Sequence, residues 1–205
     1  MSSDRQSPDD PVRLLTVCTG NICRSPYAAA LLRDGLEWAR PGAFEVTSAG
    51  THAVVGRPMD PESHRLLVEH EVDDSGFRAR MLTARVVGDQ DLVLVMTGQH
   101  RAHVLDEQPA AHRRTVGLVD LARTLGEVGD HARWRQVLED RGALDVHSRW
   151  RELPLVIAAH RGRRFGRVSD VPDPIGRGRA AFERMADTID DAVRAVVLWE
   201  ADFAG

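Results

Sequence analysis

The sequence contains no lysine, because the 27 basic residues among its 205 are all arginine. The phosphate-binding loop of P-loop nucleoside triphosphatases needs a lysine, so this lack excludes nucleotide hydrolysis of that kind. It excludes Schiff-base and lysine-base catalysis for the same reason. The sequence also has only two cysteines, which is too few for a disulfide framework. We therefore expect reduced thiols and a cytoplasmic location.

Long apolar runs are missing too. No stretch reaches the roughly 18 apolar residues of a membrane span, and residues 1–13, MSSDRQSPDDPVR, lack the apolar core of a signal peptide. A net charge of -4 gives no support for a nucleic-acid or anionic-membrane partner. The length favours one domain over two, so we expect a disordered tail at 1–11 and a single domain over 12–205.

Short apolar runs alternate with segments of helical spacing. We expect strands at 12–17, 44–48, 91–96 and 115–118, and helices at 27–39, 61–70, 98–106 and 177–201. The continuous apolar run DLVLVM at 91–96 is typical of a sheet covered on both faces. This alternation predicts the α/β class, with a doubly wound parallel sheet that has helices on both faces. A ligand in such a sheet binds at the carboxyl ends of the strands.

Residues at about 119–168 do not fit this alternation. They predict an inserted helical segment, with helices at 119–125 and 131–141 and a third at 146–161 that Pro154 interrupts. Trp134 and Trp150 are expected to attach these helices to the main body. The segment leads to residues 169–176. Three roles are therefore open for it: a lid, a docking surface or a simple elaboration of the surface.

The loop VCTGNICRSP at 17–26 joins the first strand to the first helix. Such a junction turns backbone N–H groups and a helix N-terminus toward one point, which suits an anion. Gly20 leaves room for the curl, and Asn21 tolerates left-handed backbone angles. Arg24 can hold two phosphoryl oxygens with its planar guanidinium. Cys18 at the base would be favoured as a thiolate, with the Ser25 hydroxyl beside it, and could attack phosphorus.

Cys23 has two interpretations. It either packs beneath the loop as a small apolar residue or forms a reversible disulfide with Cys18 that shields the nucleophile from over-oxidation.

A phosphoryl transfer to sulfur also needs an acid for the leaving oxygen and a base for the water that follows. The segment SDVPDPIG at 169–176 offers Asp173 between Pro172 and Pro174, which stiffen the backbone around it. Asp170 is the competing acid and ranks second.

Two polar clusters are interpreted as surface. His100, His103 and Asp106 share one helix face, where we expect a solvated surface and no metal site. The second cluster, Arg161, Arg163, Arg164 and Arg167, could attract acidic phosphopeptides, but we expect it to be a charged surface.

The sequence resembles the low-molecular-weight protein tyrosine phosphatase family over roughly 12–118 and 169–200. The matching motifs are VCTGNICRSP at 17–26, SAGT at 48–51, GRPMDP at 56–61, DLVLVM at 91–96 and DVPDP at 170–174. The resemblance implies a four-stranded parallel sheet flanked by helices. It implies Cys18 as nucleophile, Arg24 as phosphate clamp and Asp173 as general acid and then base. It further implies that Asn21, Ser25 and Ser48 support the loop, and that no metal or organic cofactor is needed. The expected phosphate-binding residues are Thr19, Gly20, Asn21, Ile22, Cys23, Arg24 and Ser25.

The sequence departs from the family pattern at two places near the expected pocket. Ile175 stands where the family often has an aromatic residue, and His52-Ala53-Val54-Val55 follows SAGT without one. The implied function is hydrolysis of phosphotyrosine-type phosphomonoesters, in phosphorylated proteins or small molecules, by a monomer or weak dimer. The alternatives are a protein-arginine phosphatase, an arsenate reductase that uses a small external thiol, and a non-catalytic phosphate-binding module. The apolar Ile22 argues against the first, because it favours an aromatic or aliphatic leaving group over a guanidinium.

Overall fold

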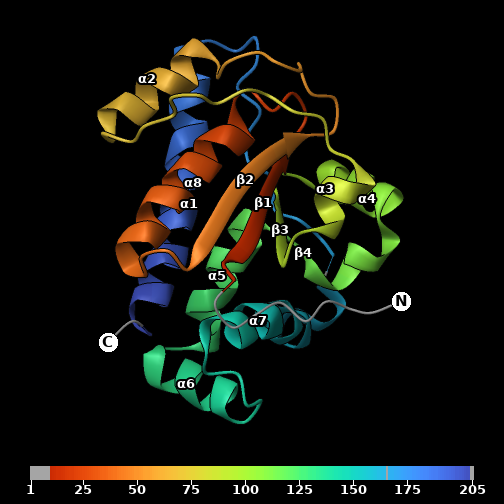
Figure 1. Ribbon diagram of the computed structural model, residues 1–205, viewed down its shortest axis with the longest axis vertical. Coiled ribbons are helices and arrows are strands. Elements are labelled where there is room, and N and C mark those ends of the chain that lie inside the picture. Colours follow the sequence, from red (N-terminus) through yellow and green to blue (C-terminus); the bar gives the residue numbers. More distant parts are fainter. Residues whose placement is uncertain (1–9, 165, 204–205) are drawn as a thin grey trace.

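The computed structural model describes residues 10–164 and 166–203, and the expected tail at 1–11 lies largely outside them. Its centre is a four-stranded parallel sheet in the order β2-β1-β3-β4 (Figure 1). The strands are β1 (Val12–Cys18), β2 (Phe44–Gly50), β3 (Leu92–Val95) and β4 (Thr115–Gly117). The predicted α/β class and parallel sheet are confirmed, and each strand begins within one residue of its predicted start.

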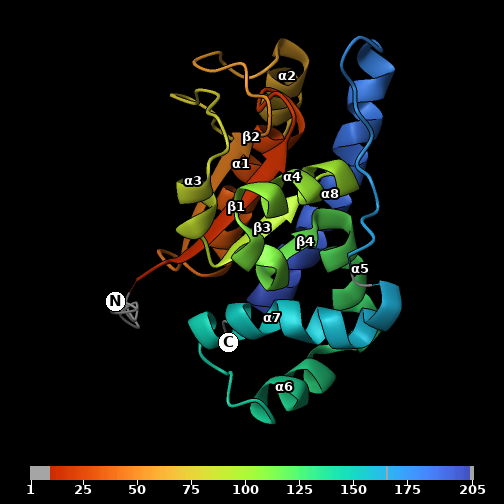
Figure 2. The same cartoon turned by 90° about the vertical axis from the view of Figure 1, so that its right-hand side faces the viewer.

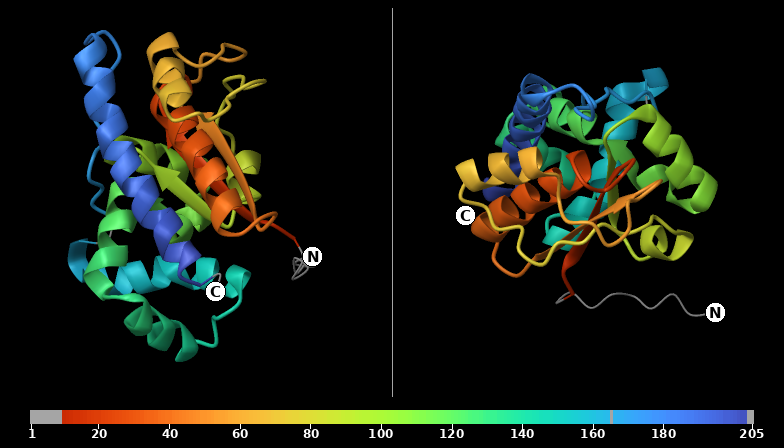
Figure 3. Two further views of the ribbon diagram at one scale, coloured as in Figure 1. Left: turned by 90° about the vertical axis from the view of Figure 1, so that its left-hand side faces the viewer. Right: turned by 90° about the horizontal axis from the view of Figure 1, so that it is seen from above.

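Helices cover both faces of the sheet. On one face lie α1 (Arg24–Ala39), α2 (Pro61–Glu69) and the long α8 (Arg179–Ala201), as Figures 1 and 3 show. On the other face lie α3 (Ala84–Gly88), α4 (Gly98–Glu107) and the short 3-10 helix η1 (Pro109–Arg114) (Figure 2). The sequence did not indicate α3 or η1, because both are too short to show a clear periodicity.

Alternation along β1 separates two cores. Leu14 and Cys18 belong to the core under α1 and α8, whereas Leu15 and Val17 belong to the core under α3 and α4. This division follows from the two-residue period of a strand, and it places Cys18 on the α1 side at the carboxyl end of the sheet. Cys18 is paired in register with Gly50 at the end of β2.

Three helices fill the segment predicted to be helical at 119–168. They are α5 (Leu118–Val128), α6 (His131–Glu139) and α7 (Val146–Arg161), followed by a short 3-10 turn, η2 (Gly162–Arg164). The predicted interruption at Pro154 is wrong, since α7 continues through it. Leu153, Pro154 and Ile157 are all buried, so packing of this face compensates for the missing backbone donor.

The predicted role of the tryptophans is confirmed. Trp134 on α6 and Trp150 on α7 both contact Trp199 on α8 edge-on, with ring centroids 5.3 and 5.8 Å apart. Trp150 also packs against Phe44, the first residue of β2, at 5.1 Å. Helix α7 therefore lies at the amino ends of the strands, below the sheet in Figure 1, and does not form a lid over the carboxyl ends. Within the described residues, no helix combines the length and the apolar character that a membrane crossing requires.

Candidate active site

The loop between β1 and α1 leads directly into a helix whose N-terminus is not capped by a side chain. Cys23 precedes α1 without a capping hydrogen bond, and the first turn of α1 contains no acidic residue. Five other helices do receive a side-chain cap, from Asp60, Thr83, Thr97, Asp130 and Asp145. The free N–H groups and the helix dipole at the start of α1 thus remain available to an anion.

Cys18 is part of a buried hydrogen-bond chain. Its Sγ lies 2.9 Å from Ser25 Oγ. Asn21 Nδ2 donates to Ser25 Oγ at 3.0 Å and to Ser48 Oγ at 2.9 Å. Because Ser25 Oγ already accepts from Asn21, its own hydrogen can point either at the sulfur or at the Ala49 carbonyl oxygen, which is more distant at 3.4 Å.

Asn21 holds the loop in an unusual shape. Its φ of 53° is left-handed, and its Oδ1 accepts from the Arg80 backbone N–H at 2.8 Å. The loop also depends on Gly50, since a Cβ there would lie 2.5 Å from the Thr19 carbonyl oxygen. By contrast, a Cβ on Gly20 would make only ordinary contacts with Ile22 and Val54. The steric argument made for Gly20 from the sequence therefore applies to Gly50.

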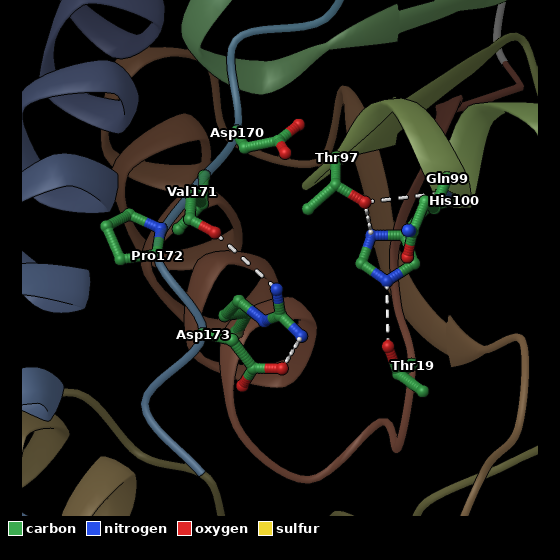
Figure 4. A pocket seen from close by; sticks show the side chains of 9 residues that line it. Thr19, Thr97, Gln99, His100, Asp170, Val171, Pro172 and Asp173 are labelled. Carbon is green, nitrogen blue, oxygen red and sulfur yellow. Dashed lines mark hydrogen bonds and ion pairs between the residues drawn. The ribbon is translucent and has the colours of Figure 1, made fainter. Parts of the chain in front are cut away.

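Arg24 and Asp173 meet across the loop. Arg24 Nη2 lies 2.9 Å from Asp173 Oδ2, and Nη1 donates to the Val171 carbonyl oxygen at 3.5 Å (Figure 4). The Arg24 side chain is buried, whereas the Asp173 side chain is 47 % exposed. Arg24 Nε is buried and has no hydrogen-bond partner among the described residues. This unpaired donor is a further point at which the loop can bind an oxyanion.

Two cavities flank the Arg24–Asp173 ion pair. The first, of about 290 Å³, contains Cys18 and the loop and has apolar walls from Ile22, Val54 and Ile175. The second, of about 310 Å³, is polar and is lined by Thr97, Gln99, His100 and Asp170, as seen in Figure 4. Both cavities share Thr19, Arg24 and Asp173, so the first can hold a reacting group and the second can hold polar groups beside it.

Asp170, the second-ranked acid, lines the polar cavity and does not line the cavity that contains Cys18. Its Oδ1 accepts from the Gly98 N–H at 3.0 Å, at the start of α4. It lines only the polar cavity, while Asp173 lines both.

The interpretation of His100 as part of a solvated face is wrong. His100 is 4% exposed, and its ring lies between two threonines, with Nε2 2.9 Å from Thr19 Oγ1 and Nδ1 3.0 Å from Thr97 Oγ1. Burial, and to a smaller extent the nearby Arg24 guanidinium, lower its pKa from 6.5 to about 4. The ring is therefore neutral at pH 7 and supports the loop through Thr19. Among the described residues, no three His, Cys, Asp or Glu side chains are grouped so that they could hold a metal ion.

Cys23 is buried and unpaired. Burial, and to a smaller extent the Asp60 carboxylate, raise the pKa of its thiol to about 12. A thiolate at Cys23 is therefore scarce at neutral pH, so any disulfide with Cys18 has to begin from attack on an oxidised Cys18 by a weak nucleophile.

Comparison with known proteins gives a consistent family relationship. The sequence model described as "Low molecular weight phosphotyrosine protein phosphatase" matches residues 13–130. The probable low molecular weight protein-tyrosine-phosphatase EpsP of Ralstonia nicotianae is 44% identical over 97 residues, which are 47% of this chain and 63% of that protein. The low molecular weight protein-tyrosine-phosphatase Etp of Escherichia coli is 40% identical over 103 residues, covering 50% of this chain and 66% of Etp. The chain thus spans slightly less than two thirds of the length of these relatives.

The fold has close neighbours among solved structures. Wzb of Vibrio vulnificus, solved in complex with benzylphosphonate, has a TM-score of 0.62 with 23% identity and covers 91% of this chain and 97% of Wzb. At that identity the likeness supports the fold alone.

Proposed function

Since the chain belongs to the low molecular weight phosphotyrosine protein phosphatase family, we propose that it is a cysteine-dependent phosphatase. It hydrolyses phosphotyrosine-type phosphomonoesters through a cysteinyl-phosphate intermediate. The main observation behind this proposal is one cavity of about 290 Å³ that is lined by Cys18, Arg24 and Asp173. Asp173 is 155 positions after Cys18 in the sequence, so the fold brings the two side chains together. A nucleophile, an anion-binding guanidinium and a carboxyl group are together the minimum for such a reaction.

The first step forms the intermediate. The phosphoryl group binds to the backbone N–H groups of residues 19–25 and to the guanidinium of Arg24, whose unpaired Nε is available to it. The thiolate of Cys18 attacks phosphorus and forms the S–P bond while the P–O bond to the leaving group breaks. Asp173 gives its proton to the departing oxygen, which leaves as a neutral alcohol or phenol.

The second step releases phosphate. Asp173, now a carboxylate, accepts a proton from a water molecule whose oxygen attacks phosphorus, and the S–P bond breaks with its electron pair returning to sulfur. The Ser25 hydroxyl, 2.9 Å from the sulfur, stabilises the thiolate that leaves. Asn21 and Ser48 keep Ser25 in place, so their role is support of the loop.

The walls of the cavity favour an aromatic leaving group. Ile22, Val54 and Ile175 offer apolar contacts to a ring, and Val54 and Ile175 are partly exposed at the mouth. A guanidinium, as in phosphoarginine, would find no carboxylate besides Asp173 in this cavity. We therefore place phosphotyrosine before phosphoarginine as substrate.

The setting of the reaction follows from its chemistry. A thiolate nucleophile has to stay reduced, and both cysteines are free, so we infer a cytoplasmic location. The partners we infer are phosphorylated proteins or small phosphomonoesters, bound by a monomer or weak dimer, with no role for nucleic acid or membrane. We further infer that α6 and α7 belong to an insertion at about 119–168 within one phosphatase domain.

A substrate panel tests the proposal. Release of phosphate is measured from p-nitrophenyl phosphate, a phosphotyrosine peptide and a phosphoarginine peptide, each with the wild type and with Cys18→Ser. We expect turnover to be fastest with the phosphotyrosine peptide and absent in Cys18→Ser, which should still bind vanadate or phosphate. Turnover that survives in Cys18→Ser would refute the proposed mechanism, and faster release from phosphoarginine would refute the proposed substrate.

A further inference from the structure

The segment that carries Asp173 is attached to the helices α5 and α7 through one buried carboxylate. Asp120 lies in the first turn of α5 and is completely buried. Its Oδ2 accepts from the Ser169 N–H at 2.8 Å, and its Oδ1 accepts from the Ser169 hydroxyl at 2.9 Å. Arg161 at the end of α7 completes the group, with Nη1 2.8 Å from Asp120 Oδ1.

The backbone of β4 is shaped for this contact. Gly117, the last residue of β4, lies against the side chains of Asp120 and Val168. A Cβ at Gly117 would be 2.5 Å from Asp120 Oδ2 and 2.8 Å from Val168 Cγ1. Any other residue at 117 would push Asp120 and Val168 aside. The close approach of β4, α5 and the segment before Asp173 therefore depends on a glycine at this position.

Arg161 has a second contact with the same segment. Its Nη2 donates to the Arg167 carbonyl oxygen at 2.9 Å. The sequence suggested that Arg161 is part of a charged surface cluster with Arg163, Arg164 and Arg167, but its side chain is only 14% exposed. Arg161 therefore joins α7 to both Asp120 and the chain that leads to Asp173.

Residues 167–173 form no helix or strand, so hydrogen bonds to other segments of the chain determine their path. Beyond Ser169, Asp170 binds the Gly98 N–H, and the Val171 N–H donates to the Met96 carbonyl oxygen at 2.8 Å. Asp120 accepts both hydrogen bonds of Ser169, the attachment that follows the Arg161 contact with the Arg167 carbonyl oxygen along the chain. The position of Asp173 depends on these contacts together. Catalysis by a carboxyl group is sensitive to displacements of about 1 Å, so loss of one contact would affect the reaction.

We propose that Asp120, paired with Arg161, is a positioning residue for the acid Asp173. Through it, α7 influences proton transfer to the leaving group although the helix lies at the opposite end of the sheet. This inference rests on the proposed phosphatase function. It predicts that a change at Asp120 weakens the acid step selectively and leaves the phosphate-binding loop intact.

Asp120→Asn tests the idea, because asparagine keeps the shape and loses the charge and one acceptor. The measurement is kcat/KM for a series of aryl phosphates, from p-nitrophenyl phosphate to phenyl phosphate, whose leaving groups differ in acidity. We expect a loss on the order of 10-fold for phenyl phosphate and less than about 3-fold for p-nitrophenyl phosphate, with vanadate affinity unchanged. Arg161→Gln should shift the series in the same direction by a smaller factor.

The chain offers a matched control in Glu200. This buried carboxylate pairs with Arg149 at 2.6 Å and accepts from Trp150 Nε1 at 2.9 Å, and among the described residues it has no hydrogen bond or ion pair to residues 167–173. Glu200→Gln should lower the melting temperature without steepening the dependence of kcat/KM on the acidity of the leaving group.

An equal loss across the series in Asp120→Asn, or the same steepening in Glu200→Gln, would overturn the inference. If Asp120→Asn does not fold, the Arg161→Gln series decides alone. A wild type that turns over no aryl phosphate would refute the phosphatase function itself.

Discussion

His100 provides a quantitative test of how the loop is supported. The substitution His100→Gln keeps a side chain able to reach Thr19 but removes a group that titrates near neutral pH. In the folded protein the pKa of His100 is about 4, mainly because the ring is buried, while its ordinary value is 6.5.

The sign of the pH effect follows from proton binding. Between these two pKa values the unfolded chain binds a proton at His100 and the folded protein does not, so acid favours unfolding. The contribution to stability is complete above pH 6.5 and is lost as the pH falls toward 4. For a pKa lowered from 6.5 to about 4, the loss between pH 8 and pH 5 is on the order of 2 kcal/mol.

Urea unfolding at pH 8 and at pH 5 measures this loss. We expect the free energy of unfolding of the wild type to fall by about 2 kcal/mol more than that of His100→Gln over this interval. The matched control is His103→Gln, since His103 lies one turn later on α4 and, among the described residues, has no hydrogen bond to the loop at 18–25. This variant keeps the His100 ring, so its fall should still exceed that of His100→Gln.

Equal falls in the wild type and His100→Gln would refute the reasoning, because His100 would then titrate alike in both states. A direct titration of the ring protons of His100 by NMR gives the same answer if the variant is too unstable to study. A midpoint near 6.5 in the folded protein would contradict the buried, neutral ring.

Three further outcomes follow from the site. Asp173→Ala should lower kcat/KM by roughly 10²–10⁴ for phenyl phosphate and far less for p-nitrophenyl phosphate, and an equal loss for both would remove Asp173 from the acid role. Gly50→Ala should weaken vanadate binding and lower turnover at least about 10-fold, because its Cβ would meet the Thr19 carbonyl oxygen at 2.5 Å; wild-type affinity would contradict this reading of the loop. After inactivation by peroxide, the wild type should recover with dithiothreitol and Cys23→Ser should not. Because burial raises the pKa of the Cys23 thiol, the recoverable fraction of the wild type should grow when the exposure to peroxide takes place at higher pH; equal recovery in both proteins would leave Cys23 as a packing residue.

The parts of the site that could be predicted from the sequence are local or lie in a recognisable motif. Cys18, Arg24 and Ser25 are within one loop between a strand and a helix, so their proximity follows from the local structure alone. Asp173 could be proposed because prolines flank it and because the family resemblance points to it. The strands and long helices were predictable for a related reason, since their apolar periodicity is carried by neighbouring residues.

The residues that sequence reasoning missed are brought to the site by tertiary structure. His100 was interpreted as solvated because its spacing with His103 and Asp106 places them on one helix face, and no local signal shows that this face packs on Thr19. Gly50 and Asp120 act through distances to chain segments far away in the sequence, and such distances are not encoded in spacing. The proline rule failed at Pro154 because tertiary packing outweighed a local preference.

Trapping the covalent intermediate tests the central claim most directly. The enzyme is mixed with p-nitrophenyl phosphate, quenched in acid within one turnover, digested and analysed by mass spectrometry for a phosphoryl group on the peptide that contains Cys18. We predict phosphate on Cys18 in the wild type, more of it in Asp173→Ala at the same level of nitrophenol release, and none in Cys18→Ser. Nitrophenol release in a burst with phosphate on another residue, or with none on the protein, would contradict the account.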